Sequence, residues 1–162
     1  MRLGTYAKEA GAPWRAACFI SGDRVVDLER ASAWARASGA LPHDGGVAGS
    51  CDIHRWIAPE GQALARQILA ALDDRSVPEV THELAAVVHG PPLTDPGKFL
   101  AVGRNYLNHV REGQRIWAAR GREVKLPAFP AAFTKFNSTI TPHGAPIVLP
   151  VGVANVDYEL EL

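Results

Sequence analysis

The chain has 162 residues, and its 17 lysines and arginines balance 17 aspartates and glutamates. This balance gives no overall electrostatic reason to bind nucleic acid or an anionic membrane. No apolar run approaches the length of a membrane span, and the first residues lack the hydrophobic core of a signal sequence. Cys18 and Cys51 lack metal-type spacing and are interpreted as reduced thiols, so the sequence predicts a cytoplasmic protein.

Residues 1–75 are predicted to form a small α/β domain. Residues 17–20 and 24–27 flank a short loop that contains glycine, a pattern typical of a β-hairpin. An alanine-rich helix is expected over residues 29–38, and a second helix over residues 59–73, where proline suits the first turn. Nothing in this domain indicates catalytic chemistry.

A connecting segment is predicted over residues 76–97. Residues 83–88 have the character of a short strand, and the prolines and glycines of residues 90–97 then indicate turns. The connection leads into the stretch KFLAVGRNYLNHVRE, which carries the first chemical motif.

That stretch, residues 98–112, is predicted to form a strand, a tight turn and a helix. Its apolar residues 99–102 have strand length, and Gly103 lets the backbone turn. On the following helix His109 and Glu112 are three residues apart and share one face. A carboxylate beside an imidazole can orient it and raise its basicity, as a general base requires, although the same pair is also common as a surface contact.

The last six residues, DYELEL, alternate between polar and apolar and predict a strand. Glu159 and Glu161 then share a face, with Cα atoms roughly 6.5–7 Å apart. Both carboxylates can converge on a divalent cation, Mg²⁺ or Mn²⁺, with Ca²⁺ as a further option. Asp157 lies on the same face and is expected to give outer support to the site. The alternative is an amphipathic strand whose acidic face is solvated.

Taken together, four segments resemble the fumarylacetoacetate hydrolase family in their order and spacing. They are GKFLAVGRNYLNHVRE, Phe133-Thr134-Lys135 with Ser138, GAPIVLP and DYELEL. The resemblance covers residues 96–162 and implies the first part of a β-rich catalytic fold built from β-roll or barrel-like sheets. The expected fold class is therefore α+β, with residues 98–162 forming an incomplete catalytic domain. One departure is Phe136, where the family pattern has proline.

The activity that this resemblance implies is metal-dependent hydrolysis of a carbon–carbon bond in a 2,4-dioxo acid, such as an acylpyruvate. A Mg²⁺ or Mn²⁺ ion at Glu159 and Glu161 would chelate the anionic substrate and stabilise an enolate as the bond breaks. His109, oriented by Glu112, would remove a proton from the attacking water. A carboxylic acid and a pyruvate-type fragment would be the products.

Two positively charged side chains are expected to bind the substrate carboxylate. The family places a lysine at the position of Lys135, and Arg104, at the turn between strand and helix, is a second candidate. Further cations follow in residues 111–125, which are read either as a solvated helix face or as a lid that attracts the anionic substrate. The resemblance also implies a homodimer and a role in aromatic catabolism.

Three alternatives remain open from the sequence. The same groups would isomerise a hydroxymuconate-type dienol if a proton were delivered in place of water, or decarboxylate oxaloacetate if carbon dioxide left. In the family, a third metal-binding carboxylate and a further lysine lie beyond the position of Leu162. The chain therefore resembles the truncated N-terminal part of a two-domain member, and a non-catalytic remnant is the third alternative.

Overall fold

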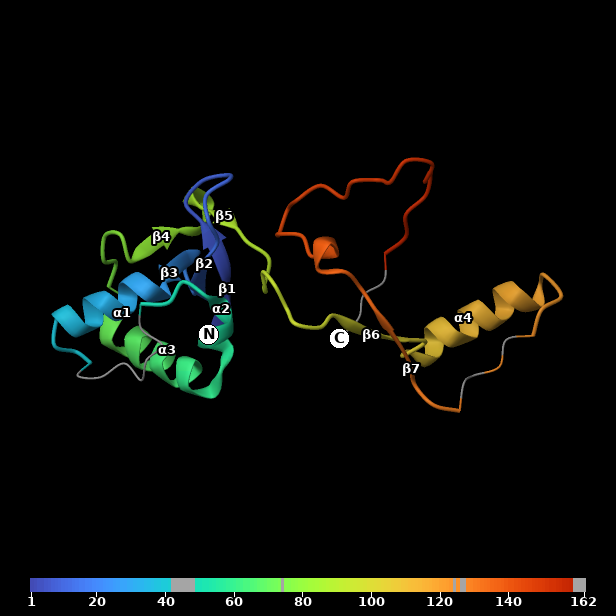
Figure 1. Cartoon of the computed structure of the whole chain (residues 1–162), viewed down its shortest axis with the longest axis horizontal. Coiled ribbons are helices and arrows are strands. Elements are labelled where there is room, and N and C mark those ends of the chain that lie inside the picture. Colours follow the sequence, from blue (N-terminus) through green and yellow to red (C-terminus); the bar gives the residue numbers. More distant parts are fainter. Residues whose placement is uncertain (42–48, 74, 124, 126–127, 159–162) are drawn as a thin grey trace. The chain divides into compact units, whose positions relative to one another are not determined.

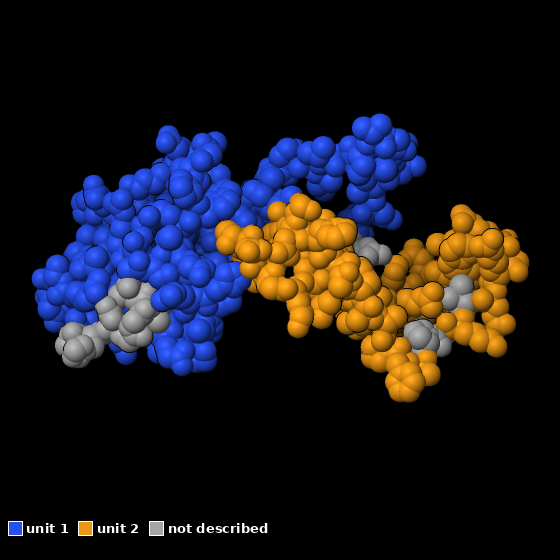
Figure 2. All heavy atoms as spheres, in the orientation of Figure 1, with its two compact units in different colours: residues 1–92, 141–162 blue, residues 93–140 orange. Residues whose placement is uncertain are grey.

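The structure is a computed structural model that describes residues 1–41, 49–73, 75–123, 125 and 128–158. The chain divides into two compact units (Figure 2). Unit 1 comprises residues 1–92 and 141–162, and unit 2 comprises residues 93–140. The described residues contain antiparallel sheets and α-helices, which confirms the α+β class. The β-roll arrangement and the domain bounds expected from the sequence stay predictions.

Unit 1 is built on an antiparallel sheet of five strands in the order β4-β3-β2-β1-β5. Strands β2 and β3 form the predicted hairpin, in which Cys18 pairs with Val26. Strand β1 pairs with β2 and with β5, so it lies inside the sheet. The strand bounds are β1 Arg2–Ala7, β2 Arg15–Ile20, β3 Arg24–Asp27, β4 Thr81–Glu83 and β5 Val88–His89.

Three helices accompany this sheet: α1 Leu28–Ala37, α2 Ile53–Ile57 and α3 Pro59–Leu72 (Figure 1). The two longer ones confirm the helices predicted over residues 29–38 and 59–73. The side chain of Asp27 caps α1 by accepting a hydrogen bond from the backbone N–H of Arg30 at 2.9 Å. The core consists of fully buried side chains that include Cys18, Val26, Leu28, Ile53, Trp56, Ala65 and Ile68.

Gly61 lets α3 approach α2 closely. A Cβ atom at this position would overlap the carbonyl oxygen of Arg55 and lie 2.6 Å from the Cα of Trp56. Alanine has the higher helix propensity by about 1 kcal/mol, but overpacking against backbone costs about 1–3 kcal/mol. We therefore expect Gly61→Ala to lower the free energy of unfolding in urea denaturation.

The exposed position Ala70 in the same helix provides the matched control for this prediction. Ala70→Gly should cost about 1 kcal/mol, because there helix propensity acts alone. If Gly61→Ala instead raised the free energy of unfolding by about 1 kcal/mol, the difference in helix propensity, the close contact between α2 and α3 would be contradicted.

The segment expected to connect the two parts of the chain contributes to the sheet of unit 1. Residues 83–88, predicted as one strand, are divided between β4, a 3₁₀ turn over Leu84–Ala86 and β5. Leu84 and Val87 pack against a cluster of Tyr6, Ala17 and Val25 on the sheet. These long-range contacts explain the difference, because a local pattern carries no information about which strand a short segment joins.

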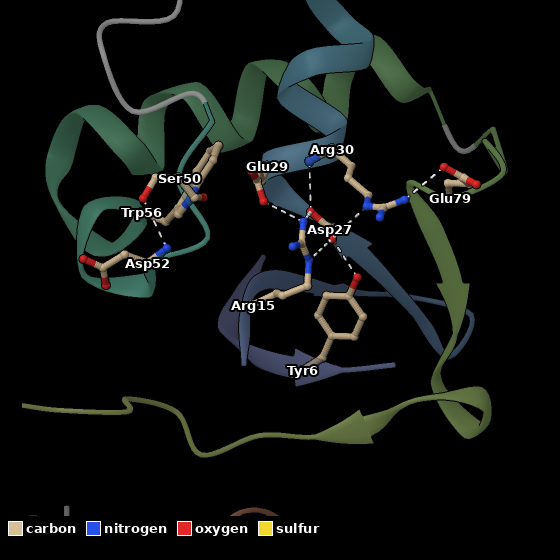
Figure 3. A network of polar contacts seen from close by, with 9 residues as sticks. All are labelled: Tyr6, Arg15, Asp27, Glu29, Arg30, Ser50, Asp52, Trp56 and Glu79. Atoms are coloured by element: carbon tan, nitrogen blue, oxygen red, sulfur yellow. Dashed lines mark hydrogen bonds and ion pairs between the residues drawn. The ribbon is translucent and has the colours of Figure 1, made fainter. Parts of the chain in front are cut away.

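A buried polar network lies beside that cluster (Figure 3). The Asp27 carboxylate is fully buried and accepts hydrogen bonds from the Tyr6 hydroxyl and from Arg15 Nε, each at 2.7 Å. Arg15 also donates to Glu29 at 2.6 Å. Burial opposes the charge of Asp27, but the hydrogen bonds from Arg15, from the Arg30 backbone and from Tyr6 hold its pKa below the ordinary value. Burial and the hydrogen bond to Asp27 raise the pKa of Tyr6.

His82 makes the stability of unit 1 depend on pH. Its ring lies 5.5 Å from that of Tyr6, and its buried Nε2 has no hydrogen-bond partner among the described residues. Burial, followed by the charge of Lys8, lowers the pKa of His82 below its ordinary value. The unfolded chain then binds more protons than the folded one, so stability should fall as pH decreases below about 6.5.

Urea unfolding between pH 8 and pH 5 measures this loss of stability. In the variant His82→Phe, the free energy of unfolding should depend less on pH. An unchanged pH slope in that variant would contradict the assignment.

Unit 2 contains the strands β6 Leu100–Gly103 and β7 Ala131–Thr134, the helix α4 Leu107–Ala118 and a 3₁₀ turn over Asn137–Thr139. The strands pair antiparallel, with Leu100 opposite Thr134 and Gly103 opposite Ala131. Strand β6 confirms the strand predicted over residues 99–102. Among the described residues of unit 2, Val110 is the one apolar side chain that is buried.

The C-terminal residues that the structure describes contain no strand. Residues 145–150 form no strand, and Ile147 and Val148 are 77% and 82% exposed. No described strand pairs with them, and a strand requires a partner for its backbone hydrogen bonds. Asp157 and Tyr158 also lie outside any strand, and the rest of the predicted final strand is beyond the described residues. Within the described residues, no helix has the length and apolar character needed to cross a membrane.

Candidate active site

The turn between β6 and α4 holds Arg104 in a left-handed backbone conformation, with φ of 57°. This conformation costs a residue with a Cβ atom roughly 1–2 kcal/mol. Such strained residues cluster at functional sites. The side chain donates a hydrogen bond from Nη1 to the carbonyl oxygen of Lys125 at 3.3 Å. Arg104 thus lies directly before the helix that carries the predicted base.

Helix α4 carries His109 and Glu112. It begins at Leu107, close to the predicted start, and continues to Ala118, beyond the predicted end. Both side chains are exposed, and their spacing of three residues places them on one helical face. An exposed imidazole can exchange protons with substrate or water, and a carboxylate one turn away can orient it. The structure confirms the helix, and the catalytic roles of the two residues stay predictions.

Lys135 lies at the other end of the β6–β7 pair. Its backbone N–H donates to the carbonyl oxygen of Phe99 at 2.9 Å, which extends the ladder by one bond. Phe99 and Gly103 are four residues apart along the strand, roughly 14 Å. The backbones of Lys135 and Arg104 therefore stand at opposite ends of this small sheet. To share a small substrate, their side chains would have to point toward each other.

A clamp that the sequence did not reveal holds the loop after Lys135. The Asn137 amide donates to Asp95 Oδ1 at 2.7 Å and to the carbonyl oxygen of Pro96 at 3.0 Å. It ties the 3₁₀ turn after β7 to the segment before β6. The partners are more than 40 positions apart, so no local pattern could have indicated the contact.

Two arginines of the basic segment after His109 contact a tryptophan in the last turn of α4. The guanidinium carbons of Arg120 and Arg122 lie 5.5 and 5.4 Å from the centre of the Trp117 ring. Such cation–π contacts are worth about 0.5–1 kcal/mol at exposed sites. Arg111 and Arg115 line an open depression on the same helix. Both the solvated face and the anion-attracting lid remain compatible with this arrangement.

The predicted metal ligands Glu159 and Glu161 lie outside the described residues. Asp157 is described, and its carboxylate accepts a hydrogen bond from the backbone of Tyr158 at 2.9 Å. In the part of the chain that the structure describes, no group of three or more His, Cys, Asp or Glu side chains could hold a metal ion. The fit to a metal therefore rests on donor chemistry, because paired carboxylates are the oxygen ligands that Mg²⁺ and Mn²⁺ prefer.

Comparison with known proteins finds a family similarity for the segment that carries these residues. The model of the fumarylacetoacetate (FAA) hydrolase C-terminal domain matches residues 98–162. Residues 98–162, called the family segment from here on, are therefore similar to the fumarylacetoacetate hydrolase family. Members of this family are enzymes of the hydrolase and tautomerase type. The family segment includes β6, α4 and β7, and with them every site residue predicted from the sequence.

Several similar curated proteins are named as mitochondrial oxaloacetate tautomerases. One from Rattus norvegicus is 35% identical and one from Homo sapiens is 37% identical, each over 71 residues that make up 44% of this chain and 20% of the relative. A third, from Bos taurus, is 36% identical over 63 residues, 39% of this chain and 24% of the relative. The chain thus spans about a fifth of the length of the first two relatives.

These relatives overturn the cytoplasmic location predicted from the sequence, because their names place them in mitochondria. The prediction was based on the plain N-terminus and the cysteine content. Neither feature reports on the compartment in which related proteins work.

Proposed function

We propose that the protein interconverts the keto and enol forms of oxaloacetate. The observation that carries this proposal is the match between the family segment and oxaloacetate tautomerases of several animals. That segment contains the histidine, the carboxylates and the cations that such a reaction needs. Of the outcomes that the family chemistry allows, proton transfer within a 2-oxo acid therefore has the strongest support.

His109 acts as the proton carrier in this proposal. Its neutral imidazole takes a proton from C3 of the keto form, and the electron pair of that C–H bond becomes the C2=C3 double bond. The protonated imidazole then gives this proton to the oxygen on C2 as the C2=O double bond opens, so His109 returns to its starting form and the atoms and charges of the substrate are conserved. Glu112, one turn further along α4, orients the imidazole and stabilises it while it is protonated.

Substrate binding is assigned to Arg104 and Lys135. Arg104 has the stronger structural support, because it lies in the turn that leads into α4 and its backbone is strained. A planar guanidinium can bind a carboxylate through two hydrogen bonds. Lys135 starts from the far end of the β6–β7 pair and contributes as a point charge to the second carboxylate.

Glu159 and Glu161 would hold a Mg²⁺ or Mn²⁺ ion. When bound, such an ion supplies Lewis acidity at the 2-oxo oxygen, which favours removal of the C3 proton. Isothermal titration of the chain with Mn²⁺ tests these ligands. We expect binding that is lost in Glu159→Gln, while Glu123→Gln, at a described position outside the predicted site, retains it.

Hydrolysis of a 2,4-dioxo acid is the second candidate. It is favoured by the exposure of His109 and Glu112, which gives water access to the base. Assays on oxaloacetate and acetylpyruvate in the presence of Mg²⁺ separate the two activities by their products. The rate of each reaction in the same buffer without protein is subtracted. Faster enol–keto exchange without acetate release supports the tautomerase. Acetate and pyruvate from acetylpyruvate, without faster exchange, would overturn it in favour of the hydrolase, and carbon dioxide from oxaloacetate would indicate a decarboxylase.

A homodimer is also part of the proposal. Leu100 and Phe133 on the β6–β7 pair are 59% and 45% exposed, which leaves apolar surface for a partner to cover. Sedimentation equilibrium measures the mass directly. A mass of one chain at micromolar concentration would contradict the dimer.

A further inference from the structure

A cavity of about 460 Å³ opens in unit 1, at the end of the sheet where β1 begins and β2 ends. The C-terminal end of α3 forms another of its walls. Its described lining residues all belong to unit 1, and none of them lies in the family segment. Cavities of this volume fall within the range of small-molecule sites.

The lining of this cavity combines an apolar body with a cationic rim. Ile20 and Leu69 are half-buried and supply apolar surface from β2 and α3, and the buried side chains of Val26 and Leu72 lie behind them. Two arginines, Arg2 and Arg75, are among the lining residues, and no acidic residue is among those that the structure describes there. Among the described lining residues the positive charges are therefore in excess, and a bound anion would reduce the repulsion between them.

Arg75 is held in place before any ligand arrives. Its Nε donates to the carbonyl oxygen of Leu72 at 3.0 Å, and Nη2 donates to that of Ala71 at 2.6 Å. Its guanidinium carbon also lies 5.7 Å from the centre of the Trp34 ring. A side chain fixed in this way loses little conformational entropy when it binds an anion, which favours affinity.

Thr81 adds a polar group whose partner is missing. Its hydroxyl is buried and makes no hydrogen bond to the described residues, although the residue lines the cavity. A change of the χ1 rotamer exchanges Oγ1 with the methyl group. A polar ligand atom in the cavity can then serve as the partner that a buried hydroxyl requires.

From these features we infer that the cavity binds an amphipathic monocarboxylate, with its alkyl or aryl body against α3 and its carboxylate between Arg2 and Arg75. The site is independent of the proposed tautomerase, because it uses no residue of that activity. It would serve as a second ligand site of the protein.

Isothermal titration of the 162-residue chain with octanoate tests this inference. We expect saturable binding with a Kd below about 1 mM. Arg2→Gln should weaken it by about tenfold, the effect of losing one charge-assisted contact. Leu69→Trp, which fills the cavity, should abolish it. Arg2 is exposed at the first position of β1, so its substitution should leave the core intact, and the unfolding temperature of each variant verifies this.

Arg66→Gln is the matched control, since Arg66 is exposed on the same helix and does not line the cavity. Octanoate affinity should be unchanged in this variant, and 1-octanol and inorganic phosphate should each bind more weakly than octanoate. Affinity that is equal for octanoate and 1-octanol, or that survives in both Arg2→Gln and Leu69→Trp, would overturn the inference. Absence of saturable octanoate binding by the folded chain would overturn it as well.

Discussion

Replacement of His109 by asparagine is expected to lower the rate of enol–keto exchange of oxaloacetate by about 100- to 10,000-fold, the usual contribution of a general acid or base. Asparagine retains a polar group of similar size but cannot carry the proton. The loss should appear in kcat more than in KM, because the imidazole acts in the transition state. Stopped-flow absorbance of the enol gives both constants.

The control for this substitution is His54→Asn, at a histidine of α2 outside the family segment. We expect His54→Asn to leave the exchange rate unchanged and Glu112→Gln to cause a smaller loss than His109→Asn. Equal rates for the wild type and His109→Asn would remove the imidazole from the mechanism. A rise in KM alone would reassign His109 to substrate binding.

Removal of the Asp27 carboxylate should have the largest effect on stability. Asp27→Ala leaves the partly buried guanidinium of Arg15 without its 2.7 Å partner, leaves the Tyr6 hydroxyl unpaired and removes the cap of α1. Breaking a buried ion pair from one side costs about 3–5 kcal/mol, and a lost cap about 1 kcal/mol. Because Arg15 keeps about a quarter of its side chain exposed, we expect a total of about 3 kcal/mol.

Urea denaturation followed by tryptophan fluorescence measures this loss. Glu79→Ala is the control, because Glu79 is 77% exposed and pairs with Arg30 at the surface. Surface pairs contribute less than about 1 kcal/mol, so this variant should remain near the wild type. Similar losses in the two variants would show that the network does not hold unit 1 together.

The helices and the hairpin of unit 1 were predictable because their signals are local. A glycine loop joins β2 to β3, and Pro59 sits at the first turn of α3. Strand β1 gave no such signal. Residues 4–7 are all buried, so this inner strand lacks the alternation of polar and apolar residues that marks a half-buried strand.

In the candidate site, too, the parts with a local sequence signal were predictable and the parts set by long-range pairing were not. The helix that carries His109 and Glu112 follows from a local motif, and the structure confirms it. The separation of Arg104 from Lys135 depends on the register of β6 against β7, which becomes known only once the strands are paired. The network around Asp27 likewise joins residues from three strands, and no spacing along the chain indicates it.

The most direct test is the rate at which the 162-residue chain accelerates enol–keto exchange of oxaloacetate in Mg²⁺ buffer, compared with the chain carrying both Glu159→Gln and Glu161→Gln. We expect catalysis by the wild type above the rate of buffer with metal, its loss on chelation, and no catalysis by the double variant. Exchange no faster than in buffer with the folded wild-type chain, or equal acceleration by both chains, would contradict the proposed tautomerase.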